Sequence, residues 1–355
     1  MYDYKKLENF CKKVFLKMGC SEEDATTAAK VLISADLRGV DSHGVARLIG
    51  YVRLWEKDRV NPKPNIKVVH ETPSTAVIDA DKALGLVAAP KAMEIAIEKA
   101  EKAGTCWISV KNSNHFGIAG YHAMKALEKD MIGIALTNAS PLVAPTFSKE
   151  RLLGTNPIAV AIPAGEQPPF VADMATTTAA NGKLEILQRK NEDAPLGWVQ
   201  DREGKQTKNA SAVKEGGALL PLGGDRTSGS HKGYCLGAVV DIFSAVLSGA
   251  GYGPWAPPFV SFLPLAKDPV GEGLGHFFGV MRIDAFRPAS EFKQHMDNWI
   301  TRFRKAEPVA GAEKVLIPGD PEREMEVIRK EEGIPLLPPV IKDLRMLADK
   351  FNIEI

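Results

Sequence analysis

The chain has 355 residues, of which 45% are hydrophobic and 25% are charged, and its formal net charge is +1. These values are ordinary for a soluble globular protein and exclude a disordered or collagen-like chain. At roughly 100–200 residues per domain, the length predicts about two domains. A net charge so close to zero excludes a strong field that would attract nucleic acid or an anionic membrane.

The cysteines and the longest hydrophobic run indicate a cytoplasmic protein. The four cysteines form no CxxC pair and no Cys/His ligand spacing, so we expect reduced thiols and no metal site. The first residues contain no apolar segment like that of a signal peptide. The longest apolar stretch, Tyr234 to Val246, is interrupted by Asp241 and is too short to span a bilayer. We therefore expect no membrane and no nucleic-acid partner.

The first part of the chain is predicted to be helical. Hydrophobic residues between Leu7 and Phe15 recur at helical spacing. Ser21 to Asp24 has the pattern of a helix start, with a capping serine and an acidic first turn, and an alanine-rich segment then runs to Leu37. The prolines in Asn61-Pro62-Lys63-Pro64 end this region.

The middle of the chain alternates β-rich runs with helical segments, and the tail is helical again. The strand candidates are Val68–Val69, Thr75–Ile78, Trp107–Val110, Ile132–Leu136 and Ile158–Ile162. The helix candidates are Ala88–Ala103, Ala119–Lys129, Thr178–Lys190, an apolar and therefore buried Gly233–Leu247, Ala289–Phe303 and Pro321–Glu332. This order predicts an α/β fold. We expect residues 1–68 and 286–355 to form one helical domain around an inserted α/β domain of residues 69–285.

Several common catalytic motifs are absent. The GxGxxG dinucleotide fingerprint does not occur, because every G-x-G lacks the third glycine in register. Neither a P-loop nor HExxH nor GxSxG is present. A standard Rossmann dehydrogenase, a P-loop NTPase, a zincin and an α/β-hydrolase are therefore disfavoured.

One group of polar residues is expected on the helix that Asp41 or Ser42 can cap and that runs to about Glu56. At spacings i, i+4 and i+8, three side chains share one face, opposite an apolar stripe: His43, Arg47 and Tyr51. The face is either a plain solvated surface or an anion site. In the second case Arg47 grips a carboxylate bidentately, His43 or Tyr51 bonds a neighbouring oxygen, and another domain or subunit covers the face.

A second candidate is His115, which follows the predicted strand ending at Val110 and precedes the helix from Ala119. Catalytic groups collect at the carboxyl ends of strands in α/β proteins. An imidazole with a pKa of about 6.5 is suited to proton exchange near neutral pH. The alternative is a histidine that is hydrogen-bonded structurally in a turn.

A third candidate is the segment Ser228–Tyr234, which leads into the apolar helix. Small residues together with Lys232 at a helix start suit a phosphate group. A simple loop before a buried helix is an equally good interpretation.

Six ordered motifs resemble the malate/L-lactate dehydrogenase family, which lacks a Rossmann fold, and they span nearly the whole chain. They are Asp36-Leu37-Arg38-Gly39-Val40-Asp41-Ser42-His43-Gly44, Asn114-His115-Phe116-Gly117, Gly154-Thr155-Asn156-Pro157, Val171-Ala172-Asp173-Met174-Ala175-Thr176, Lys232-Gly233-Tyr234 and Ile317-Pro318-Gly319-Asp320. The sequence departs from the family pattern at Cys235, where glycine is common, and in the stretch Gly251 to Pro258, which is rich in Gly, Pro and Trp.

The resemblance implies that His115 exchanges the proton of the substrate hydroxyl, although some members give that role to the residue equivalent to His43. It implies that His43 and Arg47 hold a 2-hydroxy acid, with Tyr51 and Asn156 as further substrate contacts. It also implies NAD or NADP as the cofactor, bound on a sheet of a different kind. The implied cofactor contacts are Ser140, Asp173, Met174, Ala175, Lys232, Gly233, Pro318, Gly319 and Asp320. The family is dimeric with the site at the interface, which implies a homodimer.

Taken together, the sequence predicts an NAD(P)-dependent dehydrogenase of a small 2-hydroxy acid, with malate as the first candidate. Dehydrogenases of lactate, ureidoglycolate, sulfolactate or a sugar-derived keto acid are alternatives within the same chemistry. An NAD(P)H-dependent reductase of cyclic imino acids needs the same proton donor and carboxylate grip. A catalytically inactive binding protein is the alternative from another class, but the joint presence of His43, Arg47 and His115 argues against it.

Overall fold

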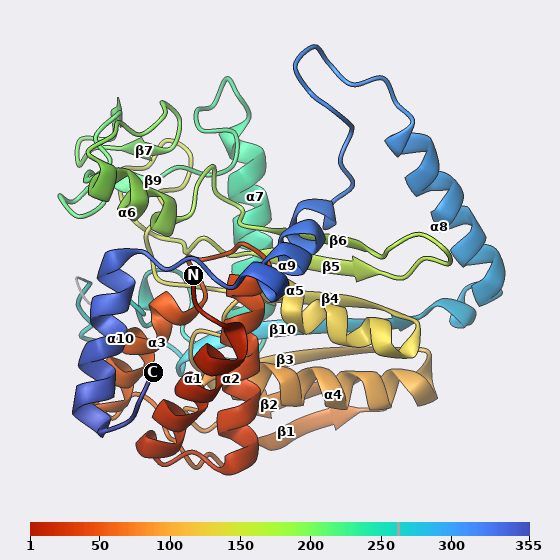
Figure 1. Cartoon of the computed structure of the whole chain (residues 1–355), viewed down its shortest axis with the longest axis horizontal. Coiled ribbons are helices and arrows are strands. Elements are labelled where there is room, and N and C mark those ends of the chain that lie inside the picture. The colour runs from red at the N-terminus through yellow and green to blue at the C-terminus, as the bar shows by residue number, and fades with distance from the viewer. Residues whose placement is uncertain (261–262) are drawn as a thin grey trace.

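The computed structural model describes residues 1–260 and 263–355, and its centre is a seven-stranded sheet with the order β1-β2-β3-β10-β4-β5-β6 (Figure 1). Only β2 and β3 run parallel, and every other neighbouring pair is antiparallel. The strands are β1 (Lys67–Thr72), β2 (Thr75–Asp79), β3 (Thr105–Ser113), β4 (Met131–Thr137), β5 (Ile158–Ile162), β6 (Phe170–Met174) and β10 (Leu274–Arg282).

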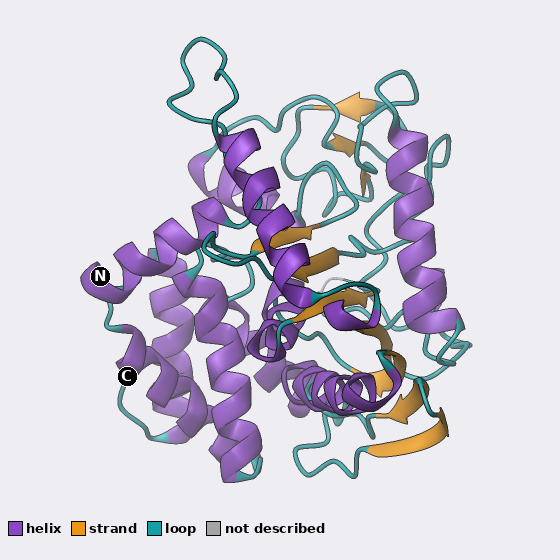
Figure 2. Ribbon diagram, turned by 90° about the vertical axis from the view of Figure 1, so that its right-hand side faces the viewer, coloured by secondary structure: helices purple, strands orange, loops and turns teal. Residues whose placement is uncertain are grey.

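Helices cover both faces of this sheet (Figure 2). On one face lie α4 (Gly85–Ala103) and α5 (Ala119–Met124), and on the other lie α7 (Ser230–Asp241) and the π-helical turn Ile242–Val246. The central strand β10 contributes Phe278 and Val280 to the core under α4 and α5, and Phe277 to a small core with Val240 of α7. Because both of its faces are covered, β10 shows no alternation of polar and apolar residues.

The two ends of the chain share a hydrophobic core beside the sheet. The helices that build it are α1 (Tyr4–Met18), α2 (Glu22–Leu37), α3 (Leu48–Trp55) and α10 (Pro338–Phe351). Leu7, Leu32 and Leu344 meet in this core, and a β-bridge joins Tyr2 to Ile334. The expected cap of α2 is confirmed, because Ser21 Oγ accepts a hydrogen bond from the backbone N–H of Asp24 over 3.1 Å.

The remaining elements lie around the sheet and the helical core. Helix α8 (Ala289–Arg304) lies at the side of the molecule away from α10, and α9 (Asp320–Glu332) packs against α2 (Figure 1). Above the helical core, α6 (Asn181–Lys190) adjoins a small sheet with the order β8-β7-β9 (Figure 1). Its strands are β7 (Val199–Gln200), β8 (Gln206–Thr207) and β9 (Ala218–Leu219). No helix within the described residues is long and apolar enough to cross a membrane.

The helix predicted from Asp41 or Ser42 begins later and faces differently. A 3₁₀ turn over Val45–Arg47 precedes α3, and neither predicted cap makes a capping hydrogen bond. Tyr51 is 0% exposed and belongs to the core of the helical region, so the polar stripe does not point away from its own core. The physical reason is that the stripe is covered within the same chain, by His115 and Phe259.

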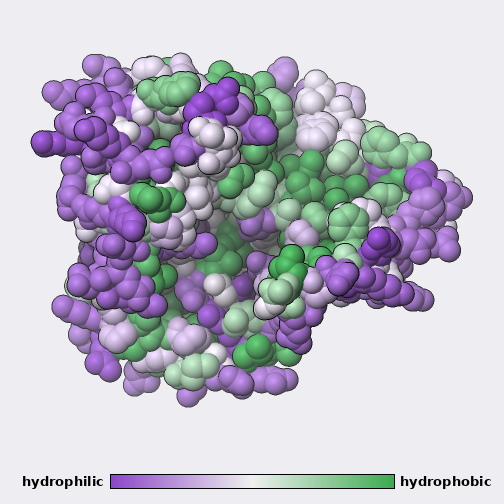
Figure 3. All heavy atoms as spheres, turned by 90° about the horizontal axis from the view of Figure 1, so that it is seen from above, coloured by the Kyte–Doolittle hydropathy of each residue, from purple (hydrophilic) through white to green (hydrophobic). Residues whose placement is uncertain are grey.

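The apolar segment Gly233–Leu247 is not buried as predicted. Only its small residues and one side contact the sheet, and the opposite side carries a row of exposed hydrophobic side chains: Tyr234, Leu236, Val239, Ile242, Phe243, Val246 and Leu247. Ile242 is 51% exposed and Leu247 is 59% exposed. Seen from above, hydrophobic residues gather toward the middle and one side of the molecule, with hydrophilic residues along the margin (Figure 3). A continuous exposed apolar row of this size indicates an interaction surface.

Candidate functional site

Two loops bring the predicted histidines together. His43 lies in the turn before α3, and His115 lies two residues after the end of β3. Their imidazole rings are stacked, with 5.5 Å between the ring centroids and 22° between the planes. Residues that are 72 positions apart in the sequence thus form one site, as the motifs predict.

His115 is held by Tyr51. The Tyr51 hydroxyl lies 2.7 Å from Nδ1 of His115, and the backbone N–H of Gly117 points at the same nitrogen from 3.4 Å. The ring of Phe259 lies 4.7 Å from the imidazole, measured between centroids. No hydrogen bond from the described residues reaches Nε2, so this nitrogen is the one available for a reacting molecule.

Burial keeps both imidazoles neutral. Burial and the nearby charge of Arg47 lower the pKa of His43 to about 4. Burial, and then the proximity of His43 and Arg47, lowers the pKa of His115 well below its ordinary value. A neutral imidazole with one free nitrogen can take a proton at neutral pH, so the site is suited to act as a general base.

Arg47 supplies the positive charge beside this pair. Its Nε donates to the backbone carbonyl of Ser42, and its Nη2 lies 3.7 Å from a carboxylate oxygen of Glu185 on α6. At 3.7 Å this ion pair is loose, and one edge of the guanidinium stays available for a second carboxylate. Glu185 was not anticipated from the sequence, because the contact joins segments that are 138 residues apart.

Asp36 stabilises the turn that carries His43 and Arg47. Its carboxyl accepts a hydrogen bond from the backbone N–H of Val45 over 2.8 Å, and burial raises its pKa to about 8. Arg329 of α9 donates to the backbone carbonyl of Asp36 and to the carboxylate of Asp41. The sequence motif contains both aspartates, but nothing in it indicates Arg329 as their partner.

Two further histidines, which have no role in the sequence-based prediction, support the His115 loop. His276 of β10 lies between two hydroxyl groups, with Nε2 2.7 Å from Ser113 Oγ and Nδ1 2.7 Å from Thr137 Oγ1. His122 of α5 binds the carbonyl of Phe116 through Nε2 over 2.8 Å. Burial lowers the pKa of His276 to about 3 and that of His122 to about 4, so both remain uncharged structural groups.

A hollow of about 400 Å³ opens beside His43 and contains three of the predicted cofactor contacts, Asp173, Met174 and Ala175. Asp173 accepts a hydrogen bond from the backbone N–H of Gly120 over 2.7 Å, and burial raises its pKa to about 6. The hollow is also lined by Thr178 to Ala180, which lead into α6.

The groups around this hollow fit a dinucleotide. The first turn of α6 has no side-chain cap, so its backbone N–H groups can bind phosphate oxygens. The carboxyl of Asp173 can accept hydrogen bonds from ribose hydroxyls. The apolar part of the lining, including Met174 and Ala175, can contact an aromatic ring. Within residues 1–260 and 263–355, no group of three or more His, Cys, Asp or Glu side chains could hold a metal ion.

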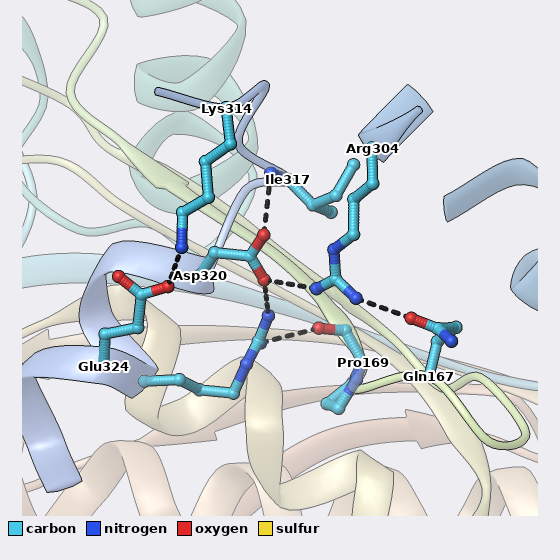
Figure 4. A network of polar contacts seen from close by, with 8 residues as sticks. Gln167, Pro169, Arg304, Lys314, Ile317, Asp320 and Glu324 are labelled. Carbon is cyan, nitrogen blue, oxygen red and sulfur yellow. Dashed lines mark hydrogen bonds and ion pairs between the residues drawn. The ribbon is translucent and has the colours of Figure 1, made fainter. Parts of the chain in front are cut away.

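Two more predicted cofactor segments adjoin this hollow without lining it. The carbonyl of Pro318 accepts a hydrogen bond from Val171, which does line it, over 3.0 Å. The adjacent Asp320 binds Arg304 and Arg323 and caps the N–H of Ile317 (Figure 4). Burial raises the pKa of Asp320, but these hydrogen bonds outweigh burial and hold it below its ordinary value.

Gly233 packs on the backbone of Leu222, another lining residue, and a side chain at Gly233 would collide with it. Lys232 beside it is exposed. Ser140 lies on the other side of the site, where its Oγ accepts a hydrogen bond from the N–H of Phe259 over 2.9 Å. Asn156 is 0% exposed and its amide donates to the carbonyl of Gly237, so this amide is occupied in holding α7.

Comparison with known proteins gives one consistent result. The sequence model of the family described as malate/L-lactate dehydrogenase matches residues 2–345. The malate dehydrogenase of Pyrococcus horikoshii is 43% identical over 98% of this chain and 95% of its own length. The L-sulfolactate dehydrogenase of Methanocaldococcus jannaschii is 37% identical over 96% of this chain and 94% of its own length.

A solved structure agrees with these relatives. The crystal structure of malate dehydrogenase from Entamoeba histolytica superposes with a TM-score of 0.92 at 34% identity, covering 99% of this chain and 98% of that one. The likeness therefore extends through the seven-stranded sheet, the helical core and the loops that carry the site.

Proposed function

The chain belongs to the malate/L-lactate dehydrogenase family and is therefore an oxidoreductase of 2-hydroxy acids with a nicotinamide cofactor, and from this premise we propose that malate is its substrate. The observation that carries the proposal is the joint placement of His115, His43 and Arg47, with Tyr51 bonded to His115. Two relatives named malate dehydrogenase are 43% and 42% identical to the chain, against 37% for an L-sulfolactate dehydrogenase, which supports malate over other 2-hydroxy acids.

The proposed chemistry assigns each side chain one task. Arg47 binds the C1 carboxylate of the acid through the free edge of its guanidinium. His115 takes the hydroxyl proton at Nε2, while its Nδ1–H donates to the Tyr51 oxygen. In this assignment Nδ1 carries its hydrogen both before and after Nε2 takes the proton, so the Tyr51 oxygen accepts the Nδ1–H hydrogen bond in both protonation states. When bound, the nicotinamide supplies the acceptor for the hydride that leaves C2.

His43 is the other candidate for proton exchange. It lines the cofactor hollow and its Nδ1 lies 2.8 Å from Ser42 Oγ, whereas Nδ1 of His115 lies 2.7 Å from the Tyr51 hydroxyl. We assign His43 to positioning the substrate between Arg47 and the cofactor. We assign proton exchange to His115, because its free nitrogen is opposite a fixed partner that can stabilise the imidazolium.

The cofactor, NAD or NADP, is proposed to bind in the hollow between β6 and the start of α6. Asp173, Met174 and Ala175 would contact it directly, with Lys232, Gly233 and the Pro318–Asp320 turn at its margins. The mixed sheet is consistent with a nicotinamide-binding domain of the non-Rossmann kind, of residues 69–285. For the expected helical domain of residues 1–68 plus 286–355, the shared core supports α1, α2, α3 and α10, whereas α8 packs against the sheet through Trp299 and Phe170 of β6.

We further propose that the protein is a cytoplasmic homodimer. The exposed apolar row on α7 and the π-helical turn supports a second copy of the chain as a partner. An apolar row of this kind is suited to the core of a dimer interface, which is more apolar than the rest of a protein surface.

The proposal is tested with purified protein, NAD+ or NADP+, and a panel of 2-hydroxy acids, followed at 340 nm. We expect absorbance to grow with malate, and a parallel reaction of cyclic imines with NADPH tests the reductase alternative. Cofactor binding without turnover on any substrate would instead support the inactive binding protein. If the absorbance at 340 nm rises with none of the acids, the proposed function is contradicted.

A further inference from the structure

A second hollow, of about 350 Å³, begins at Arg47 and runs along the outer side of α3 toward α6. Arg47 and Phe259 line its inner end, and Phe259 lies 4.7 Å from the His115 ring, measured between centroids. Phe259 thus contacts both this hollow and the His115 ring, and Arg47 belongs both to this lining and to the proposed substrate site. It does not include the residues that line the cofactor hollow, such as Asp173.

Cations dominate the lining of this second hollow. Besides Arg47, four basic side chains line it: Arg53, Lys57, Arg59 and Lys214. Of the carboxylates in the described part of the chain, two line it as well: Glu185 and Asp343. The lining thus has five positive and two negative groups, a surplus of three positive charges in a protein whose formal net charge is +1.

These cations are not neutralised by the chain itself. Among the described residues, none of the four has a carboxylate within ion-pair distance. Arg59 donates to the carbonyl of Pro258 over 2.8 Å, and Lys214 donates to the side-chain oxygen of Gln188 over 2.6 Å. Arg59 is half-buried, and burial lowers its pKa. A partly buried cation with only neutral acceptors is stabilised by a bound anion, so the hollow is suited to an anionic group.

We propose that this hollow is the subsite for a second acidic group on the substrate, a carboxylate or a sulfonate carried beyond C2, and that Arg53 and Lys214 are the residues that select for it. The inference rests on the proposed oxidation of a 2-hydroxy acid and specifies its substrate class. Arg47 holds the C1 carboxylate at the inner end, and the second acidic group extends into the cationic part. The enzyme therefore prefers diacidic 2-hydroxy acids to monoacidic ones.

Arg53 and Lys214 are the residues to change because both side chains are exposed, so their substitution does not disturb the core. Arg59 is unsuitable, since its half-buried guanidinium donates to the carbonyl of Pro258, which its substitution would leave without this partner. The test compares wild type with the double variant R53Q/K214Q. A matched control, R302Q/K305Q, removes two exposed positive charges at the end of α8, at the far side of the molecule.

The measured quantity is kcat/KM at saturating cofactor for three acids. Malate and sulfolactate carry a second acidic group, and 2-hydroxybutanoate carries a methyl group where malate has its second carboxylate. We expect the ratio of malate to 2-hydroxybutanoate to fall about ten- to a hundredfold in R53Q/K214Q, the usual effect of losing charge-assisted hydrogen bonds, and to stay within about twofold in the control. The sulfolactate arm shows whether the subsite takes a sulfonate as well as a carboxylate.

An unchanged ratio in R53Q/K214Q, or an equal fall in the control, would overturn the subsite while leaving the dehydrogenase intact. A wild type that prefers 2-hydroxybutanoate to malate would overturn it too. A wild type that oxidises none of the acids would overturn the proposed function itself, so the two failures are distinguishable. Melting temperatures of the variants within a few degrees of wild type exclude unfolding as the cause of any loss.

Discussion

His115 is the residue on which the proposed reaction depends most directly. Its environment leaves Nε2 as the nitrogen that can take a proton, because Tyr51 is the partner of Nδ1. Burial disfavours the imidazolium, so the ring is neutral before it reacts. We expect His115→Ala to lower kcat for malate oxidation by about 10²–10⁴-fold, the usual contribution of an acid–base group. His70→Ala, which changes an exposed histidine of β1, is the matched control. A near-normal kcat in His115→Ala would transfer the proton exchange to His43.

The lowered pKa of His115 and His43 predicts how oxidation depends on pH. A base must be neutral to take a proton, and a lowered pKa keeps the neutral form populated further into the acidic range. We expect kcat/KM to change little between pH 7 and about pH 6. It should fall to half its maximum only at a pH below about 6. The measurement is a pH profile of the initial rate at low substrate. A half-maximum at or above the ordinary pKa of histidine would contradict the burial argument.

Asp36 offers a test of stability at a residue outside the reaction. Its pKa is raised from an ordinary 3.8 to about 8, so the folded state binds the proton more tightly than the unfolded state. The stability from this proton is complete below about pH 4 and is lost as pH rises through about 8. We expect Asp36→Asn, which does not titrate, to melt at an increasingly higher temperature than wild type as pH rises from about 5 to 9. A difference in melting temperature that does not change with pH would show that Asp36 has the same charge in the folded and the unfolded chain across this range.

At the scale of elements, the exposed side of α7 is the feature with the clearest consequence. Its apolar row is incompatible with free solvent over such a length, and a second copy of the chain is the proposed cover. We expect Ile242→Glu to convert a dimer into monomers, because it places a charge in the centre of the apolar row. Val327→Glu on α9, where the side chain is 59% exposed, is the control. Molar mass by light scattering distinguishes the two, and a dimer that persists in Ile242→Glu would place the interface elsewhere.

Local signals in the sequence were sufficient for some elements. The spacing of Leu7 to Phe15 and the cap at Ser21 define α1 and the start of α2, because both signals lie within a few residues. The position of His115 two residues after the end of β3 is likewise local. The strand candidates around 75–78, 107–110, 132–136 and 158–162 all fall inside strands of the sheet.

Elements that depend on distant partners could not be predicted in this way. β10 was missed because a strand covered on both faces has no period of two, and its two glycines at 275 and 279 resemble turn signals. Helix α10 and strand β6 were missed as well. The direction of the Tyr51 side chain depends on its contact with His115. The exposure of α7 depends on which of its sides contacts the sheet. Neither contact can be predicted from the local sequence.

For the candidate site, the residues came from the motifs and the geometry came from the fold. The motifs predicted His43, Arg47 and His115 as site residues, and the fold places these three residues close together. The supports of the site, such as Asp36 under Val45 and His276 between Ser113 and Thr137, are single residues on other elements. Their roles arise from contacts between segments that no local pattern connects.

At the scale of the whole molecule, a formal net charge of +1 conceals an uneven distribution. Five basic groups line the hollow at Arg47, whereas the cofactor hollow is largely apolar around Asp173. In the proposed function, the cationic hollow is the substrate side and the hollow at Asp173 is the cofactor side, with His43 and His115 between them. We infer that this local charge binds the acid without a strong overall field.

The most direct test of the central claim is the fate of the hydrogen on C2. Malate carrying deuterium at C2 is incubated with the protein and oxidised cofactor in ordinary water, and the reduced cofactor is analysed by mass spectrometry. Hydride transfer at this site predicts one deuterium atom in each reduced nicotinamide, because the hydrogen passes directly and only the hydroxyl proton exchanges through His115. Reduced cofactor that carries hydrogen from water instead would contradict the account.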